Sequence, residues 1–188
     1  LLQERYIKYL KKHIELAKKY CKDYNITKVK LVTQGGKDFI DSCINGMDAI
    51  KGVCKSDDVV LITSADRPFI SPEEIEDSIR VCKMHGSGIP ARKCPLCMFE
   101  VGEDRTHSSK YRRDTLMLTS TPWSFSYGKL AEALEKYRNG ELKECESYPI
   151  AIFAAAGNEV FFSKALPGNI KITEKTDIAL MECILKQK

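Results

Sequence analysis

The stretch that decides the fold reads Leu166-Pro167-Gly168-Asn169-Ile170-Lys171-Ile172-Thr173 and continues into the acidic and apolar run Glu174 to Leu185. The Pro-Gly turn and the β-branched residues after it predict a short strand, and the apolar residues that follow recur at helical spacing. Lys171 lies at the hinge between strand and helix. Its ammonium is a compact point charge on a long stem, so it suits a site for phosphate oxygens; an exposed strand lysine is the other interpretation.

Two segments upstream have the same form, a predicted strand that ends in unusual residues. Gly35-Gly36 follows the predicted strand Val29 to Thr33, and Ser64-Ala65-Asp66-Arg67-Pro68 follows the near-continuous apolar strand Val59 to Thr63, which we expect to be buried on both faces. The carboxyl ends of strands form the ligand crevice of open α/β sheets. Three such clusters at strand ends therefore predict a binding site there.

Asp66 and Arg67 are the charged pair at the second of these strand ends. Mg²⁺ in nucleotide sites takes one or two carboxylates together with substrate oxygens, so Asp66 is a candidate Mg²⁺ ligand beside a phosphate contact from Arg67. A local ion pair that caps a turn is the alternative interpretation, because many surface pairs contribute nothing measurable.

Predicted strands and helices alternate through most of the chain, which favours an α/β layered sheet with right-handed crossovers. The segment Ser87 to Ser120 is short of periodicity and is expected to leave the main sheet. Ile150 to Ala156 shows little periodicity. The remaining predicted elements are helices over Leu1 to Lys22, over Asp41 to Val53, from Ser71-Pro72 and from Tyr127 to Asn139, and a strand over Glu159 to Phe162.

Composition excludes several classes of protein. The 188 residues include 30 basic and 26 acidic ones, and no block of five like charges marks a nucleic-acid surface. No apolar run approaches the roughly 20 residues of a membrane span, so we expect no membrane partner. Leu1 to Lys22 carries charges throughout, unlike a signal peptide, and the eight cysteines are expected to be reduced thiols in a soluble, reducing compartment.

Zinc binding is a competing hypothesis for the middle of the chain. Cys82-x-x-His85 and Cys94-x-x-Cys97 together provide enough ligands for a tetrahedral site. Only one Cys-x-x-Cys pair is present, however, and Gly86 to Lys93 would have to fold back to join the two halves. We therefore favour unpaired thiols.

Four of these segments resemble one family. Gly35 to Met47 is similar to the Gly-Gly, Ser-Val, Gly-Leu signature of the 2-C-methyl-D-erythritol 4-phosphate cytidylyltransferases and their ribitol-5-phosphate relatives. Ala65 to Ile70 resembles their Asp-Ala-Ala-Arg-Pro strand end, and Arg113 to Phe125, with Thr121-Pro122, resembles their Thr-Pro-Gln segment. Asn169 to Thr173 reproduces their Asn-Ile-Lys-Ile-Thr. Because the segments also occur in the family's order, the agreement is more specific than any single motif.

The resemblance implies a Rossmann-like nucleotidyltransferase sheet with helices on both faces and a protruding β-arm, over a single domain of residues 1–188. It implies transfer of CMP from CTP to a polyol phosphate with release of pyrophosphate, Mg²⁺ as cofactor, and a homodimer assembled through an arm at about residues 93–120. The implied roles are a nucleotide site at Gly35, Gly36, Ser42 and Ala65, and catalytic residues Lys171, Arg67 and Arg113, of which Arg113 clamps the polyol phosphate and Lys171 neutralises the attacked phosphate. The metal role moves to Asp66, because the family's own Asp aligns with Ser64.

The chain departs from the family's pattern at several positions. The family's strand-end Asp aligns with Ser64, the Asp-Thr pair of its arm with Leu96-Cys97, and the Gln after Thr-Pro with Trp123. These departures leave three alternatives open: 2-C-methyl-D-erythritol 4-phosphate as acceptor, ribitol 5-phosphate as acceptor for teichoic acid or capsule synthesis, or a catalytically inactive nucleotide-binding paralogue.

The family's first strand and glycine-rich triphosphate loop would lie before Leu1. We therefore expect the domain to be N-terminally incomplete. A cytoplasmic location is expected, and an organelle-targeting segment upstream of Leu1 stays open.

Overall fold

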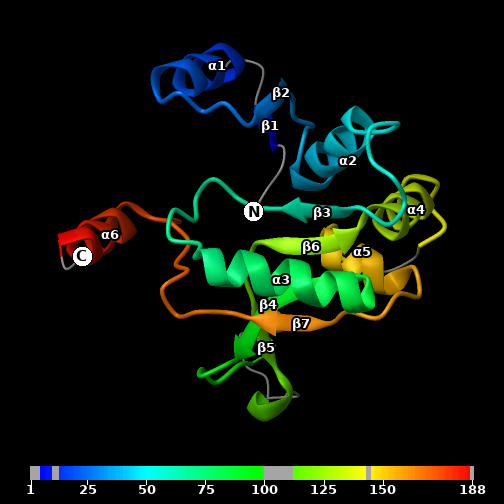
Figure 1. Ribbon diagram of the computed structural model, residues 1–188. Coiled ribbons are helices and arrows are strands. Elements are labelled where there is room, and N and C mark those ends of the chain that lie inside the picture. Colours follow the sequence, from blue (N-terminus) through cyan, green and yellow to red (C-terminus); the bar gives the residue numbers. More distant parts are fainter. Residues whose placement is uncertain (1–4, 10–12, 100–111, 143–144, 187–188) are drawn as a thin grey trace. The chain divides into compact units, whose positions relative to one another are not determined.

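The computed structural model describes residues 5–9, 13–99, 112–142 and 145–186. The chain divides into two compact units. The first comprises Leu1–Val60 and Phe125–Val160, and the second comprises Leu61–Ser124 and Phe161–Lys188. Strands β3 (Val59–Ile62) and β6 (Trp123–Ser126) each have residues in both units (Figure 1).

The described residues of the first unit form a small parallel sheet and four helices. Strands β1 and β2 pair in parallel with Tyr6 opposite Leu31 and Tyr9 opposite Gln34. Apolar side chains of the helices form the core of this unit, and the rings of Phe125 and Phe153 lie 5.0 Å apart within it. The elements are β1 (Arg5–Tyr9), α1 (Ile14–Asp23), β2 (Val29–Gln34), α2 (Phe39–Ala49), α4 (Tyr127–Arg138) and α5 (Pro149–Ala155).

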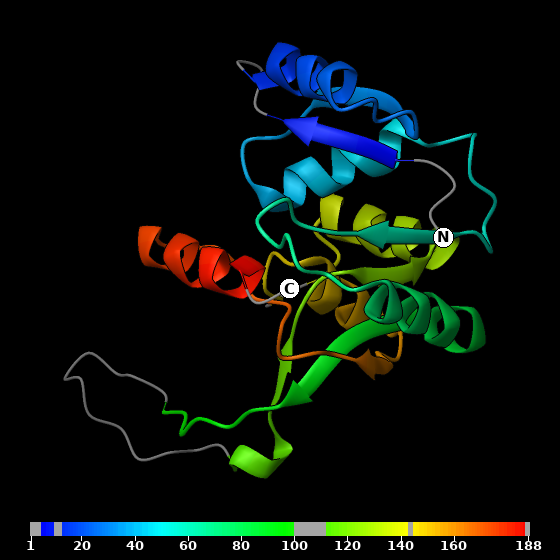
Figure 2. The same ribbon diagram turned by 60° about the vertical axis from the view of Figure 1, so that its left-hand side comes forward.

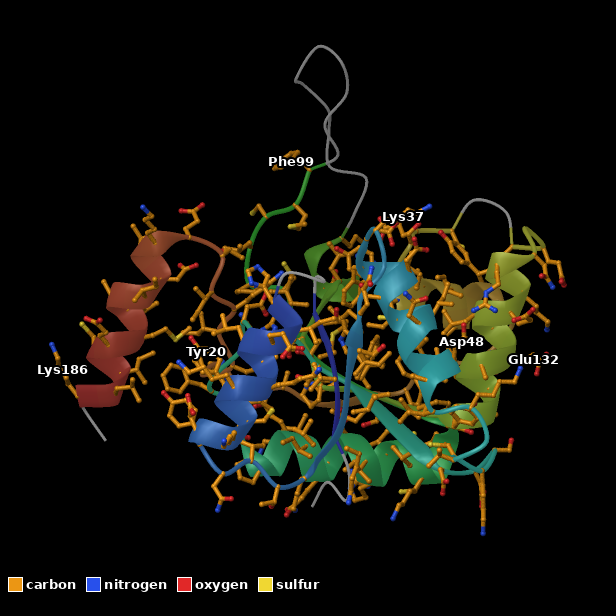
Figure 3. The ribbon with its side chains drawn as sticks, turned by 90° about the horizontal axis from the view of Figure 1, so that it is seen from above. Tyr20, Lys37, Asp48, Phe99, Glu132 and Lys186 are labelled. Atoms are coloured by element: carbon orange, nitrogen blue, oxygen red, sulfur yellow. The ribbon has the colours of Figure 1, made fainter. Side chains whose placement is uncertain are left out.

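Helix α4 begins where its first residues bind the loop before β3. Tyr127 N donates to Asp58 O at 2.8 Å, and Gly128 N donates to Ser56 O at 2.9 Å. The N-cap Ser126 does not cap the helix with its side chain, because its Oγ donates to Ser56 O. The other end of α4 is tied to α2 by an ion pair of 2.7 Å between Arg138 and Asp48, which is labelled in Figure 3.

The second unit contains most of the larger sheet. The strand order is β3-β6-β4-β5, and β7 pairs with β4. Strand β4 pairs in parallel with β7, Ile89 opposite Phe162, and antiparallel with β5, Lys93 opposite Met117. The sheet is therefore mixed and open. The elements of this unit are α3 (Pro72–His85), β4 (Ser87–Lys93), the 3-10 helix η2 (Arg113–Thr115), β5 (Met117–Thr119), β7 (Phe162–Lys164) and α6 (Lys175–Lys186).

Helix α3 packs on β4 and β7 and has strong signals at both ends. Ser71 Oγ accepts a hydrogen bond from Glu74 N, and the Glu74 side chain reaches back to Ser71 N, which is a complete capping box. Pro72 follows at the first helical position, and Gly86 ends the helix with φ 95°. The predicted helix start at Ser71-Pro72 is confirmed.

Two arms of chain extend from the sheet of this unit. In Figure 2 the green chain runs outward beyond the end of β4, η2 lies outward of the start of β5, and α6 lies beyond the segment that follows β7. The predicted α/β fold class with a protruding β-arm is confirmed.

Several predicted elements are wrong, and the cause in each is a tertiary contact. Leu1 to Lys22 is not one helix, because Arg5–Tyr9 pairs with β2 as a strand before α1 begins. Asn169 to Thr173 is not a strand: Ile172 N donates to Asp66 O and Asn169 N donates to Leu166 O. The β-branched pattern therefore marks a docked segment.

The segment Ser87 to Ser120 does not leave the main sheet at its start. Ser87–Lys93 is β4, which pairs with both β5 and β7, and its first four residues are buried. The β4 sequence does not alternate between apolar and polar residues, because the strand is covered on both faces. The predicted burial of β3 on both faces is also wrong, because this strand lies at one end of the sheet and is half-buried throughout.

The other differences are ones of position. The predicted helix Asp41 to Val53 is α2, which begins earlier because Asp38 accepts from Asp41 N as its N-cap. The candidate strand Glu159 to Phe162 is β7, three residues further on. Helix α5 has no clear periodicity in its seven residues and was not predicted. Within the described residues, no helix has both the length and the apolar character to span a membrane.

Candidate active site

The strand end after β3 and the segment after β7 come together within the second unit. Ile172 N donates to Asp66 O at 2.8 Å, which fixes the backbone of the two segments side by side. Lys171 Nζ then lies 3.6 Å from Asp66 Oδ2, and both side chains are partly exposed, 48% and 35%. A loose, exposed ion pair holds its partners weakly. Lys171 can therefore turn to a phosphate without losing a strong contact.

Arg67 is the second cation of this cluster. Its Nη1 donates to Asn169 O at 2.8 Å and lies 3.4 Å from Asn169 Oδ1. Partial burial lowers the pKa of Arg67, and the nearby charges of Asp66 and Glu74 oppose that shift. A guanidinium remains protonated in proteins under these conditions. Arg67 and Lys171 thus place two positive charges beside one carboxylate.

Glu74 and Asn169 hold this cluster in place, and neither is among the predicted site residues. Glu74 is fully buried, and its Oε1 accepts from Leu166 N at 3.0 Å and from Asn169 Nδ2 at 3.1 Å. Asn169 Nδ2 also donates to Thr121 O at 2.8 Å. The capping-box spacing at Ser71 signals Glu74 in the sequence, but it indicates only a helix start.

The predicted nucleotide-binding residues Gly35, Gly36 and Ser42 form a turn in the first unit. Gly36 N donates to Ser42 Oγ at 2.9 Å, and Ser42 Oγ donates to Asp38 O at 2.8 Å. A Cβ on Gly36 would lie 2.8 Å from Ser42 N and closer still to Asp41, so only glycine fits there. The structure thus places Gly36 beside Ser42, and the nucleotide-binding role of Gly35, Gly36 and Ser42 remains a prediction.

Asp66 is the residue predicted to hold Mg²⁺. Its Oδ1 accepts from Ser64 Oγ, its Oδ2 faces Lys171, and its side chain reaches solvent. No three His, Cys, Asp or Glu side chains gather as a metal site within the described part of the chain. A Mg²⁺ ion that takes most of its ligands from phosphates and water needs only one or two carboxylates. A single half-exposed carboxylate fits that requirement.

For the other predicted site residues, Ala65 and Arg113, the structure gives a position and no side-chain contact. Ala65 is exposed at the strand end beside Asp66. Arg113 begins η2, and its side chain lies outside the described residues. Residues 100–111 of the predicted arm also lie outside them. The roles of Ala65 and Arg113 remain predictions.

The zinc hypothesis is not supported. Cys82, His85, Cys94 and Cys97 are all described, and they form no cluster that could hold a metal ion. Cys82 and Cys94 are buried, and the His85 ring stacks on Phe161 with centroids 4.1 Å apart. None of the eight cysteines, all of which are described, forms a disulfide.

The sequence and the fold both have relatives of known type. The family model described as 2-C-methyl-D-erythritol 4-phosphate cytidylyltransferase matches residues 7–187. An enzyme of that name from Clostridium botulinum (strain ATCC 19397 / Type A) is 30% identical over 179 residues, 95% of this chain and 76% of the relative. A ribitol-5-phosphate cytidylyltransferase from Lacticaseibacillus paracasei is 26% identical over 170 residues, 90% of this chain and 73% of the relative.

Solved structures agree on the fold. The 4-diphosphocytidyl-2C-methyl-D-erythritol synthase from Anaerococcus prevotii matches with a TM-score of 0.81 at 22% identity, over 98% of this chain and 79% of that one. The 2-C-methyl-D-erythritol 4-phosphate cytidylyltransferase of Francisella tularensis also gives 0.81, at 23% identity over 97% and 81%. With the family model matching nearly the whole sequence, this chain belongs to the 2-C-methyl-D-erythritol 4-phosphate cytidylyltransferase family.

Proposed function

We propose that the protein transfers CMP from CTP to 2-C-methyl-D-erythritol 4-phosphate in the cytoplasm and releases pyrophosphate. One observation carries the proposal: the segment with the family's Asn-Ile-Lys-Ile-Thr sequence is docked on the strand end after β3, so that Lys171 lies 3.6 Å from Asp66 and near Arg67. Two cations at one strand end suit an anionic pair of substrates.

The reaction needs positioning and charge stabilisation more than covalent chemistry. A phosphate oxygen of the acceptor forms a bond to the α-phosphorus of CTP, and the bond from that phosphorus to the bridging oxygen of pyrophosphate breaks. Negative charge grows on the phosphorus oxygens during this exchange, and Lys171 is the residue that would neutralise it. Arg67 is held by Asn169 and would hold a phosphate in line for the attack.

Asp66 would hold Mg²⁺, which supplies further positive charge to the phosphates when it is bound. The Ser64 hydroxyl donates to the same carboxylate and orients it. Ser64 stands where the family has its Asp, so Asp66 takes over that role in this proposal.

Assembly as a homodimer through the arm of residues 93–120 is also part of the proposal. Leu96 is 63% exposed and Phe99, labelled in Figure 3, is 61% exposed. Leaving such side chains in water costs about 25 cal/mol for each Å² of apolar surface. A neighbouring subunit would cover them, and Arg113 would then complete the neighbour's site.

One assay, pyrophosphate release from CTP, distinguishes the proposed function from two others. Ribitol 5-phosphate is the alternative acceptor because a relative of that name matches 90% of the chain. Pyrophosphate release from CTP should be measured with each acceptor and with none. Release that requires 2-C-methyl-D-erythritol 4-phosphate supports the proposal, and release only with ribitol 5-phosphate would transfer it to that acceptor. CTP binding without turnover on either would favour a nucleotide-binding paralogue.

A further inference from the structure

Glu74 is a fully buried carboxylate whose two oxygens face in two directions. Its Oε2 accepts from Ser71 N at 3.1 Å and from Ser71 Oγ at 3.3 Å, which is the helix-capping side. Its Oε1 accepts from Leu166 N and from Asn169 Nδ2, residues 92 and 95 positions away. A capping glutamate needs only the first pair of contacts. The second pair joins the start of α3 to the segment that carries Lys171.

The second pair of contacts leads directly to the cations of the strand end. Asn169 donates from its side-chain Nδ2 to Glu74, and its backbone oxygen accepts from Arg67. The side chain and the backbone of Asn169 are therefore both fixed. Lys171 follows two residues later, and the next residue, Ile172, binds Asp66 through its backbone N–H. The segment 166–172 is thus tied at Leu166 and Asn169 by Glu74 and at Ile172 by the strand end.

We propose that Glu74 is a positioning residue for the transfer reaction, because it fixes the segment 166–172 and thereby the place of Lys171. The inference rests on the proposed function, since Lys171 is the residue whose placement it controls. Glu74 itself touches no substrate in this proposal. It acts through Leu166 and Asn169.

The four contacts of Glu74 make it sensitive to loss of one oxygen. Every partner is a donor, so both oxygens must accept. In Glu74→Gln the shape is kept, but one oxygen becomes an NH₂ group that faces donors. A buried donor that loses its acceptor is costly, and the site must shift to relieve it. A small displacement of a catalytic group can lower the rate by up to about 100-fold.

A double-mutant cycle tests the inference. Glu74→Gln should lower kcat about 10-fold in the wild-type background, with a smaller change in the KM for CTP. In a Lys171→Ala background the same substitution should change kcat less than about 2-fold, because effects that run through one group do not add. Equal losses of kcat in both backgrounds would overturn the proposal.

Ser78→Ala is the matched control. Ser78 lies one turn after Glu74 on α3 and is equally buried, but its Oγ contacts Gly88 O at 2.8 Å and Ser124 Oγ at 2.6 Å. Its loss should lower stability and leave kcat unchanged. A kcat loss in Ser78→Ala equal to that in Glu74→Gln would reduce Glu74 to a general stabilising role.

Hydrogen exchange gives a test that does not depend on activity. In Glu74→Gln the amides of Leu166 and of the segment up to Ile172 should exchange faster, whereas Ser78→Ala should not change them selectively. If the wild type transfers no CMP, the proposed function fails and the exchange result still decides whether Glu74 fixes the segment. Unchanged exchange in Glu74→Gln would overturn the inference. If that variant does not fold, Asn169→Ala removes the contact with Glu74, together with the one to Thr121 O, and leaves the other three Glu74 contacts in place.

Discussion

Arg67 is held by a partner 102 residues away in the sequence, whereas Gly36 and Ser42 are held by partners six and four residues away. The first region, the strand-end cluster, consists of Asp66, Arg67, Glu74, Asn169 and Lys171. The second, the glycine turn, runs from Gly35 to Ser42. Both match family signatures, but the hydrogen bonds of Gly36 and Ser42 join neighbouring residues, whereas the strand-end cluster also joins residues 95 and 102 positions apart.

The difference decides what a substitution can do. A change at Gly36 or Ser42 disturbs hydrogen bonds to residues six or four positions away, so we expect its effect on the fold to stay local. A change in the strand-end cluster releases a segment that long-range hydrogen bonds fix to the strand end, so it moves charges that lie several residues away. Substitutions in the strand-end cluster should therefore lower kcat with little change in the free energy of unfolding. Substitutions in the glycine turn should mainly lower the free energy of unfolding.

Lys171→Ala should have the largest effect on activity. The substitution removes a positive charge aimed at the reacting phosphate, and such a loss lowers kcat by about 100-fold or more. The side chain is about half exposed, so the free energy of unfolding should change little. Steady-state pyrophosphate release checks the rate, and urea unfolding checks the fold. Lys175 is an exposed lysine at the start of α6, and the control variant Lys175→Ala should keep the wild-type kcat. Undiminished turnover in Lys171→Ala would remove Lys171 from the mechanism.

Asp66→Asn should act on the metal dependence. The Mg²⁺ concentration for half-maximal activity should rise about 10-fold, since loss of one carboxylate weakens the site, and activity should return at higher Mg²⁺. The half-exposed side chain carries little packing, so the variant should fold. A Mg²⁺ titration of the rate measures the shift. If Asp66→Asn kept the wild-type Mg²⁺ dependence, Asp66 would not be a metal ligand and would only form the ion pair with Lys171.

Gly36→Ala should be the counterpart in the glycine turn. The added Cβ would crowd Asp41 and the nitrogen of Ser42, and overpacking of this kind costs about 1–3 kcal/mol. Urea unfolding should show the loss, with weaker CTP binding as a secondary effect. Gly168→Ala, where a Cβ meets nothing within 4 Å, should leave stability unchanged. Equal stability of the two variants would contradict the local clash.

The same contrast explains what the sequence could predict. The glycine turn and the start of α3 follow from spacings of three to six residues, which are visible in the chain itself. The packing of Glu74 on Asn169 is not visible, because no spacing rule links residues 95 positions apart. The sequence predicts a strand over the docked segment for the same reason: β-branched residues suit any extended backbone, and only the hydrogen bond from Ile172 N to Asp66 O shows where this segment binds.

The smallest expected effect lies at the end of the docked segment, where the chain returns to local contacts. Asp177 in the first turn of α6 accepts from Thr173 N at 2.7 Å, from Thr173 Oγ1 at 2.9 Å and from Glu174 N at 2.9 Å. The hydrogen bond from Glu174 N, then those from Thr173, lower the pKa of Asp177. The stabilisation is therefore present above the unfolded pKa of about 3.9 and is lost as the pH falls through the lower folded value.

Acidification should accordingly loosen the first turn of α6. Hydrogen exchange of the Thr173 and Glu174 amides should be measured at pH 6 and again at a pH below the unfolded pKa of Asp177. Asp177→Asn should show fast exchange at these amides already at pH 6, because a neutral amide oxygen accepts hydrogen bonds more weakly than a carboxylate. The Ile172 amide, which binds Asp66 O, should stay protected in both proteins. If Ile172 loosened together with Thr173, the start of α6 and the docked segment would be one cooperative structure, and the distinction between local and long-range contacts would not hold there.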